Sequence, residues 1–330
     1  MVKLSLEDVR VARERIAGYV RHTPLVPLPP LQDDLPSQLR LKLENLQVVG
    51  SFKPRGVFNT LLQLSDDAKR RGVIAASGGN HGVALAYAAS RLHIPATVYL
   101  PATASADRVA RVSRWNAQVI QHGTAWDDAH KKALEHAEAE NLHYVHPFDA
   151  EKTLAGQGTL GLELLDDVPE VDFALIAIGG GGLIAGMAMA IKAIKPHVKI
   201  IGVEPVGSPS MKRAMEAGHV VELPEVRTIA DTLAPRAVSE RTLELTQRYV
   251  DEVVLVDDAS MIDAMRWLWL NCNQLVEPAG AAVIAALLTG AVDVSRFHHP
   301  VALICGGNAA AETVWSTYED MAAAKGSLIP

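Results

Sequence analysis

Residues 174–194, ALIAIGGGGLIAGMAMAIKAI, decide the fold class. A short aliphatic run leads into four consecutive glycines, which are followed by an alanine- and methionine-rich stretch. This order predicts a buried strand, a tight loop and a helix, which is the first part of a βαβ unit. Four glycines at a helix N-terminus let the backbone approach an anion with no Cβ in the way. The stretch therefore predicts an α/β fold with a phosphate-binding loop at residues 179–182.

The same alternation of short β-branched runs and alanine-rich stretches extends along the chain. Strands are expected at 72–77, 96–101, 117–122, 142–147, 173–179, 199–205, 252–258 and 301–307. Helices are expected at 83–92, 126–140, 183–194 and 261–275. Proline and polar residues cluster at two places, PLVPLPPLQDDLPSQ and HPFDAEKT, and suggest domain boundaries. We expect an α/β protein with parallel sheets, a small domain at 48–147 and a large domain formed by 1–47 and 148–330.

Composition excludes several classes of function. The chain has 330 residues, of which 49% are hydrophobic, enough for a sizeable core. Its formal net charge is -7 and it contains no basic block, so we expect no nucleic-acid partner. No apolar run approaches the roughly 20 residues that span a bilayer, and the N-terminus lacks the apolar core of a signal peptide. Two cysteines without metal-type spacing indicate a reducing, cytoplasmic compartment.

Two further stretches carry candidate chemistry. GSFKPRGVFN, residues 50–59, places Lys53 at the expected start of a helix, either as a surface lysine or as a pocket amine with a lowered pKa. SGGNHG, residues 77–82, is a glycine-rich loop between a strand and a helix. It is either a tight turn or an anion site, and the polar side chains of Asn80 and His81 favour a ligand there.

A dinucleotide enzyme is the competing hypothesis. Gly180, Gly182 and Ala185 fit the pattern G-x-G-x-x-A, and Glu204 closes the next strand where a ribose-binding acid would stand. This hypothesis of a NAD-dependent oxidoreductase leaves Lys53 and the SGGNHG loop without a role. One cofactor needs an amine, a phosphate cradle and donors around an aromatic ring, and that cofactor is pyridoxal phosphate.

The sequence also resembles the fold-type II pyridoxal-phosphate enzymes, and among them the threonine/serine dehydratase and serine racemase group. The resemblance covers nearly the whole chain through HTPLVPL, KLENLQVVGSFKPRG, SGGNHG, AGQGTLGLELL, GGGGLIAG, GVEP, VEPAGAA and CGGN. It implies a two-domain fold like that of the tryptophan synthase β subunit, with an open, mostly parallel sheet flanked by helices in each domain. It also implies a homodimer.

The resemblance assigns residue roles. Lys53 would be the catalytic Schiff-base lysine, with Phe52 packed beside the cofactor ring and Asn80 bonded to its phenolic oxygen. The phosphate would be held by the backbone amides of Gly179, Gly180, Gly181, Gly182 and Leu183. The substrate carboxylate would be bound by Ser77, Gly78, Gly79 and His81 together with Asn80. Cys305 would face the pyridine nitrogen. Glu277 either lies near the ring or is merely a carboxylate favoured by a helix N-terminus.

A thiol rather than a carboxylate at the pyridine nitrogen favours prompt expulsion of a β-substituent. We therefore expect a dehydratase, or ammonia-lyase, that converts a threonine- or serine-like 3-hydroxy amino acid to a 2-oxo acid and ammonia. A serine racemase is the alternative within the family. Racemases carry a serine where this chain has Gly78, which can carry no proton, so elimination should dominate.

Three departures from the relatives limit the comparison. In the racemase branch, the acid that matches Glu204 binds a divalent ion together with a second acid. This chain has Ser210 at the second position, and a serine hydroxyl is a poor ligand for a hard cation. We therefore expect no metal, and Glu204 is only a weak candidate ligand. Dehydratase relatives usually have glycine where Thr232 stands, so Thr232 should narrow the substrate pocket. The chain ends soon after CGGNAA, so no regulatory domain and no inhibition by isoleucine are expected.

Overall fold

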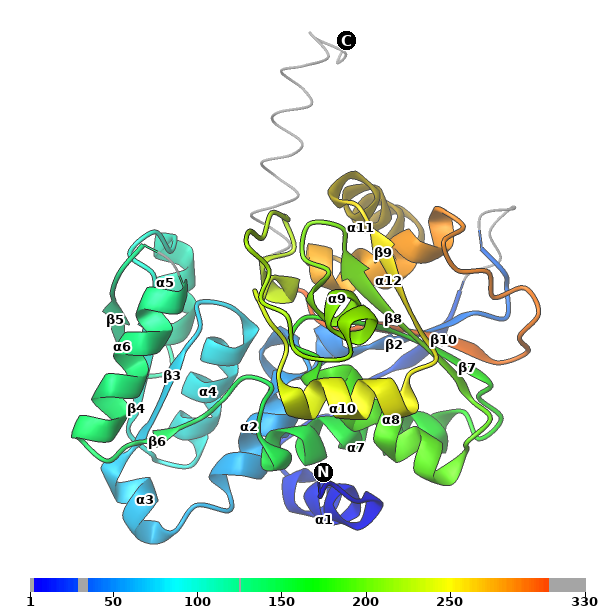
Figure 1. Cartoon of the computed structure of the whole chain (residues 1–330). Helices are drawn as coiled ribbons and strands as arrows, with labels where there is room; N and C mark the ends of the chain where they lie inside the picture. Colours follow the sequence, from blue (N-terminus) through cyan, green and yellow to red (C-terminus); the bar gives the residue numbers. More distant parts are fainter. Residues whose placement is uncertain (1–2, 29–34, 125, 309–330) are drawn as a thin grey trace, which may run out of the picture.

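The computed structural model describes residues 3–28, 35–124 and 126–308, which form two sheets with their flanking helices. Figure 1 shows the smaller sheet and its helices on the left and the larger sheet on the right. The expectation that no regulatory domain follows CGGNAA concerns residues after 308, which lie outside this description. Within the described part, no helix combines the length and the apolar character that crossing a membrane requires.

The larger sheet has six strands in the order β1-β2-β10-β7-β8-β9. These strands are β1 (Leu25–Pro27), β2 (Arg40–Leu43), β7 (Phe173–Ala177), β8 (Lys199–Pro205), β9 (Glu252–Val256) and β10 (Pro300–Ile304). All neighbours are parallel except β1 and β2. The four predicted strands of the second half are confirmed, whereas β1 and β2 were not anticipated. A proline-containing strand is tolerated at β1 because it lies at the sheet edge.

The smaller sheet is wholly parallel and has the order β5-β4-β3-β6. Its strands are β3 (Val73–Ala76), β4 (Ala96–Leu100), β5 (Gln118–Gln121) and β6 (His143–Tyr144). The prediction of a strand over 142–147 is wrong in length. The Val145 amide still bonds to the Ile74 carbonyl, but the chain then turns away, and Pro147 has no N–H to continue a ladder.

Helices cover both sheets, and the four predicted helices are confirmed. They are α1 (Leu6–Ile16), α2 (Lys53–Leu61), α3 (Asp66–Arg71), α4 (Asn80–Arg91), α5 (Ala106–Ser113), α6 (Trp126–Ala139), α7 (Glu151–Asp167), α8 (Gly182–Ile194), α9 (Ser210–Ala217), α10 (Glu240–Tyr249), α11 (Asp258–Cys272) and α12 (Pro278–Leu288). The 3₁₀ turns are η1 (Glu44–Leu46), η2 (Val48–Gly50) and η3 (Asp231–Leu233). The buried strands β7, β8 and β10 lie in the core of the larger sheet, with α12 and α8 packed against it.

The topology brings the glycine-rich loops toward one region. Both loops follow the carboxyl end of a parallel strand, β3 for residues 77–79 and β7 for residues 178–181, and each leads directly into a helix. Ligands bind at such carboxyl ends in open α/β sheets. Helix α2 packs against α4 of the smaller unit and α7 of the larger one. The N-terminus of α2, which carries Lys53, is therefore placed where the two units meet.

Candidate active site

Lys53 is the first residue of α2, as predicted, and its side chain enters a cavity between the two glycine-rich loops. Its Nζ donates a hydrogen bond to the Pro147 carbonyl at 2.9 Å and lies 5.0 Å from the centre of the Phe52 ring. Desolvation lowers the pKa of Lys53 to about 8, against the opposing effects of the Cys305 and Glu277 side chains. A neutral amine is therefore accessible near physiological pH.

The loop 179–182 forms a cradle of backbone atoms against the same cavity. Gly181 has φ +84°, in the left-handed region, and no described side chain caps the N-terminus of α8. A Cβ on Gly180 would lie 2.3 Å from the Phe148 ring, and one on Gly182 would lie 2.9 Å from the Phe148 Cβ. Because the first amides of a helix have no intrahelical partner, this loop offers donors to an anion. Leu183 lines the cavity just after it.

Asn80, the first residue of α4, is held on both sides of its amide. Its Nδ2 donates to Glu277 Oε1 at 2.6 Å, and its Oδ1 accepts from Asn308 Nδ2 at 2.7 Å. Glu277 is the N-cap residue of α12 and also accepts from the Asn308 amide at 3.1 Å and from the Thr232 hydroxyl at 3.3 Å. These two hydrogen bonds orient the side-chain amide of Asn80, and they leave its second Nδ2 hydrogen for another acceptor. Glu277 both lines the cavity and stands at the N-terminus of a helix.

Cys305 follows β10 and is buried at the end of the cavity. Its Sγ lies 3.4 Å from the Ala279 carbonyl, to which the thiol donates. Burial, reinforced by the carboxylate of Glu277, raises the pKa of the Cys305 thiol far above its usual range. The group at this position is therefore a neutral thiol.

The loop 77–79 and the start of α4 line a larger, open cavity of about 880 Å³ that also reaches Lys53 and Gly180. Gly79 is the N-cap residue of α4, and no described side chain caps this helix start. The side chain of His81 is buried, and its Nε2 donates to the Val145 carbonyl at 2.8 Å. Burial and the nearby Lys53 charge lower the pKa of His81 to about 3, so the ring is neutral at physiological pH.

The predicted site residues, except Glu204, all line one or both of these cavities. Residues that the sequence interpretation did not single out also line the larger cavity, namely Trp126, Arg108, Asp231, Arg236, Pro147 and Phe148. The sequence signals nearest to Pro147 and Phe148 were the end of the expected strand 142–147 and the cluster HPFDAEKT, which was interpreted as a domain boundary. Asn308 was part of the quoted motif CGGN, but its contact with Asn80 could not be read from the sequence.

Glu204 lies apart, in the buried strand β8. Its carboxylate accepts hydrogen bonds from the Met211 amide at 2.8 Å and the Lys212 amide at 2.9 Å, and the Ser210 hydroxyl lies at 3.5 Å. Burial raises the pKa of Glu204 to about 7, against these hydrogen bonds. Both carboxylate oxygens are thus used to hold the start of α9, and neither is presented to a ribose.

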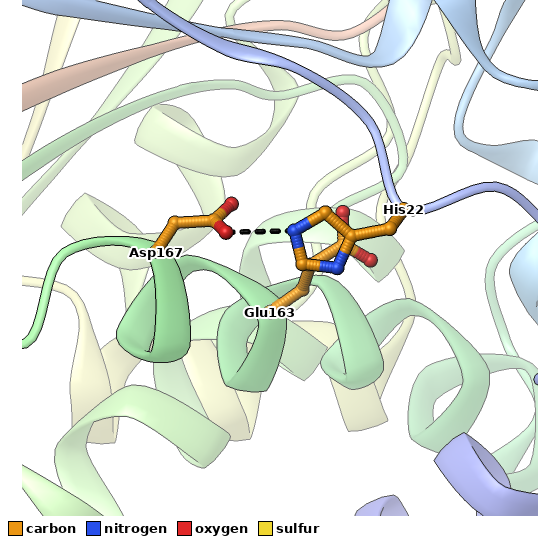
Figure 2. A group of neighbouring side chains, drawn as sticks. All are labelled: His22, Glu163 and Asp167. Carbon is orange, nitrogen blue, oxygen red and sulfur yellow. Dashed lines mark hydrogen bonds and ion pairs between the residues drawn. The ribbon is translucent and has the colours of Figure 1, made fainter.

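His22, Glu163 and Asp167 form a cluster that has the composition of a metal site (Figure 2). Lys42 already occupies the cation position, because its Nζ lies 2.7 Å from Glu163 Oε1 and 2.6 Å from Asp167 Oδ2. Arg55, on the first turn of α2, pairs with the other oxygen of Glu163 at 2.9 Å. The cluster therefore belongs to a buried ion-pair network that ties the start of α2 to α7.

The model of the pyridoxal-phosphate dependent enzyme family matches residues 16–306. The chain belongs to this family. The family match supplies the cofactor, pyridoxal phosphate, and favours it over the dinucleotide alternative.

Individual relatives of this pyridoxal-phosphate dependent enzyme are similar over most of its length. It is 38% identical over 305 residues to an L-threonine ammonia-lyase of Thermotoga maritima, covering 92% of this chain and 76% of the relative. It is 36% identical to a serine racemase of Oryza sativa subsp. indica, covering 94% of this chain and 93% of the relative. The solved structure of maize serine racemase superposes with a TM-score of 0.90 at 33% identity, over 98% of this chain and 100% of the other.

The cavity beside Lys53 fits pyridoxal phosphate in its chemistry. Lys53 offers an amine for the aldehyde, and the loop 179–182 offers backbone amides where any Cβ would clash. Asn80 has an oriented amide hydrogen, and the neutral Cys305 thiol closes the cavity. These four features would suit an aldehyde, a phosphate, a phenolic oxygen and a ring nitrogen, respectively, which are the groups of this cofactor.

Proposed function

We propose that this pyridoxal-phosphate dependent enzyme is an ammonia-lyase that converts a threonine- or serine-like 3-hydroxy amino acid to a 2-oxo acid and ammonia. The observation that carries the proposal is the neutral Cys305 thiol in the cavity of Lys53. The neutral thiol of Cys305 would leave the ring nitrogen of a bound cofactor unprotonated, and the weaker electron sink would favour loss of the β-hydroxyl. The similarity to L-threonine ammonia-lyases supports the same reaction.

Lys53 is the proposed base. When bound, the cofactor supplies an electron sink for the pair left on Cα after the proton leaves. The amine of Lys53 takes that proton, and its pKa of about 8 keeps a useful fraction of it neutral at physiological pH. The Pro147 carbonyl, 2.9 Å from Nζ, gives the free amine of Lys53 a defined resting position in the cavity.

The α4 start is the proposed carboxylate site. Ser77, Gly78 and Gly79 precede a helix N-terminus whose amides have no intrahelical partner, and the loop borders the open cavity. Asn80 would donate its second Nδ2 hydrogen to the phenolic oxygen. Thr232 narrows this region, because its Cγ2 would lie 3.2 Å from a Cβ on Gly79.

Racemisation is the second candidate, on the strength of the similarity to serine racemases. It requires a proton donor on the face opposite Lys53. Gly78 has no side chain, and His81 is neutral with its Nε2 hydrogen engaged by the Val145 carbonyl. Neither residue supplies a proton, so elimination should greatly exceed racemisation.

The test is a panel of 3-hydroxy amino acids assayed in parallel for ammonia, 2-oxo acid and D-isomer. The wild-type protein should release ammonia and 2-oxo acid in equal amounts from L-threonine or L-serine. Lys53→Ala should lose both turnover and the absorbance band near roughly 410 to 420 nm. Retained 2-oxo acid production in this variant, or D-isomer formed as fast as 2-oxo acid, would overturn the proposal.

We also propose the organisation expected from the sequence, with a small domain at 48–147 and a large domain at 1–47 and 148–330. The placement of β3 to β6 in one sheet and of the other described strands in the second supports this division.

A homodimer is supported by exposed apolar side chains on α11 and the turn after it, Trp269, Leu270 and Leu275, whereas Trp267 belongs to the core. Two free cysteines support a reducing, cytoplasmic location. Light scattering during gel filtration tests the dimer, and a monomeric mass would refute it.

A further inference from the structure

The segment Val145–Asp149, between β6 and α7, holds two side chains of the active site through its backbone. The Pro147 carbonyl accepts from Lys53 Nζ, and the Val145 carbonyl accepts from His81 Nε2. Two carbonyls that lie two residues apart thus orient both groups. The position of Lys53 depends on the shape of this short segment.

His146 lies between the two carbonyls and closes the turn. Its Nδ1 accepts hydrogen bonds from the Phe148 amide at 3.2 Å and the Asp149 amide at 2.8 Å. A ring nitrogen that accepts must be unprotonated. Burial lowers the pKa of His146 to about 4, so the accepting form persists at physiological pH. Asn and Asp side chains close turns in the same way, by accepting from amides just ahead of them.

We propose that His146 is a positioning residue for Lys53: its Nδ1 fixes the turn, and the turn presents the Pro147 carbonyl to the amine. His146 acts through this carbonyl and does not contact the reacting atoms. The inference rests on the proposed function only in taking Lys53 as the reactive amine.

A purely structural role for the ring would give a different result. The imidazole packs edge-on against the Phe148 ring, with centroids 4.7 Å apart, and lies near the rings of Tyr144 and His130. Ring packing and hydrogen-bond acceptance can be separated by substitution. In His146→Asn, Oδ1 is attached to Cγ as Nδ1 is in histidine, so the acceptor is kept and the ring is lost. His146→Phe keeps the ring and loses the acceptor.

The experiment measures covalent attachment of pyridoxal phosphate to the apoprotein across pH, followed at roughly 410 to 420 nm. We expect His146→Phe to attach the cofactor about tenfold more slowly, because a displaced amine loses its aligned approach. We expect His146→Asn to stay within about twofold of wild type. Equal impairment of both variants, or impairment of His146→Asn alone, would overturn the proposal in favour of ring packing.

The pH profile adds a readout that packing alone would not move. Lys53 is faced by Glu277, Cys305 and His81, and these groups are unchanged in every variant. His146 is faced by Asp149, His130, Arg241 and Lys53 itself, which are also retained. Because these groups are retained, a change in the midpoint of the attachment profile reports on the contact between Lys53 and the Pro147 carbonyl. We expect the midpoint to shift in His146→Phe and not in His146→Asn. Unshifted midpoints in both variants would contradict the proposal.

Two further measurements keep the result interpretable. Thermal unfolding establishes that each variant is folded, and His146→Leu serves as a second acceptor-free variant if His146→Phe does not fold. His146→Leu attaching the cofactor at the wild-type rate would also overturn the proposal. The proposed function can fail independently of this inference. If the wild-type protein attaches the cofactor but releases no ammonia, the proposed reaction is refuted. The role of His146 is then still decided by the attachment rates of its variants.

Discussion

Replacing Gly180 by alanine should weaken cofactor binding through a clash with Phe148. The added Cβ would lie 2.3 Å from Cγ and Cδ1 of that ring and 2.5 Å from Cε1. Carbon atoms in good contact are about 3.5–4.0 Å apart, so the ring has to move by about 1 Å or more. Overpacking of this kind costs about 1–3 kcal/mol. The free loop can relieve the clash by leaving its phosphate-binding shape, and restoring that shape on binding then costs the same energy, which corresponds to roughly 5- to 150-fold weaker binding. Phe148 also follows Pro147, so its displacement disturbs the partner of Lys53.

The assay is a titration of apoprotein with pyridoxal phosphate, with the dissociation constant taken from the absorbance of the bound cofactor. Gly18→Ala is the matched control, because a Cβ there meets nothing within 4 Å. Phe148→Ala removes the obstructing ring, so the penalty of Gly180→Ala should shrink in that background. A dissociation constant for Gly180→Ala within about twofold of wild type, or the same penalty with and without the Phe148 ring, would refute the reasoning.

Three further predictions concern charge and proton transfer. The folded-state pKa of Glu204, about 7, lies above the ordinary carboxyl value of 4.5, so its contribution to stability is complete at low pH and is lost as pH rises through 7. Between pH 5 and pH 8, the free energy of unfolding measured with urea should therefore fall less in Glu204→Gln than in wild type. An equal fall in both proteins would contradict this prediction. Chelation by EDTA should leave ammonia release unchanged, and a loss restored by a divalent cation would show a metal requirement. Gly78→Ser should gain D-serine formation, measured by chiral chromatography, because the serine hydroxyl adds a proton donor that glycine lacks. The nearest atoms to a Cβ at Gly78 belong to the side chains of Leu100, at 3.2 Å, and Arg108, at 3.9 Å, so the side chain can be accommodated. If D-serine formation did not increase, the absence of a side chain at Gly78 would not explain weak racemisation.

The fold class, most of the strands and four of the helices could be predicted from the sequence because their causes are local. Alternating apolar runs and alanine-rich stretches predicted β3 to β5, β7 to β10 and the helices α4, α6, α8 and α11. Among the strands, the exceptions were decided by partners far along the chain. Strand β1 exists because β2 pairs with it, and β6 is short because the chain turns at Val145 to reach the active site.

The sequence by itself determined which chemical groups are present: an amine at a helix start, two glycine loops that expose amides, and a thiol after a buried strand. Only the tertiary structure decided what each group contacts. The Pro147 carbonyl meets Lys53 across 94 residues, and Asn308 meets Asn80 across 228. The pKa values of Lys53 and Cys305 depend on burial and on neighbours from other elements, and no local pattern encodes these. Side-chain type is a property of the sequence, whereas desolvation and partner geometry arise only when distant segments pack together.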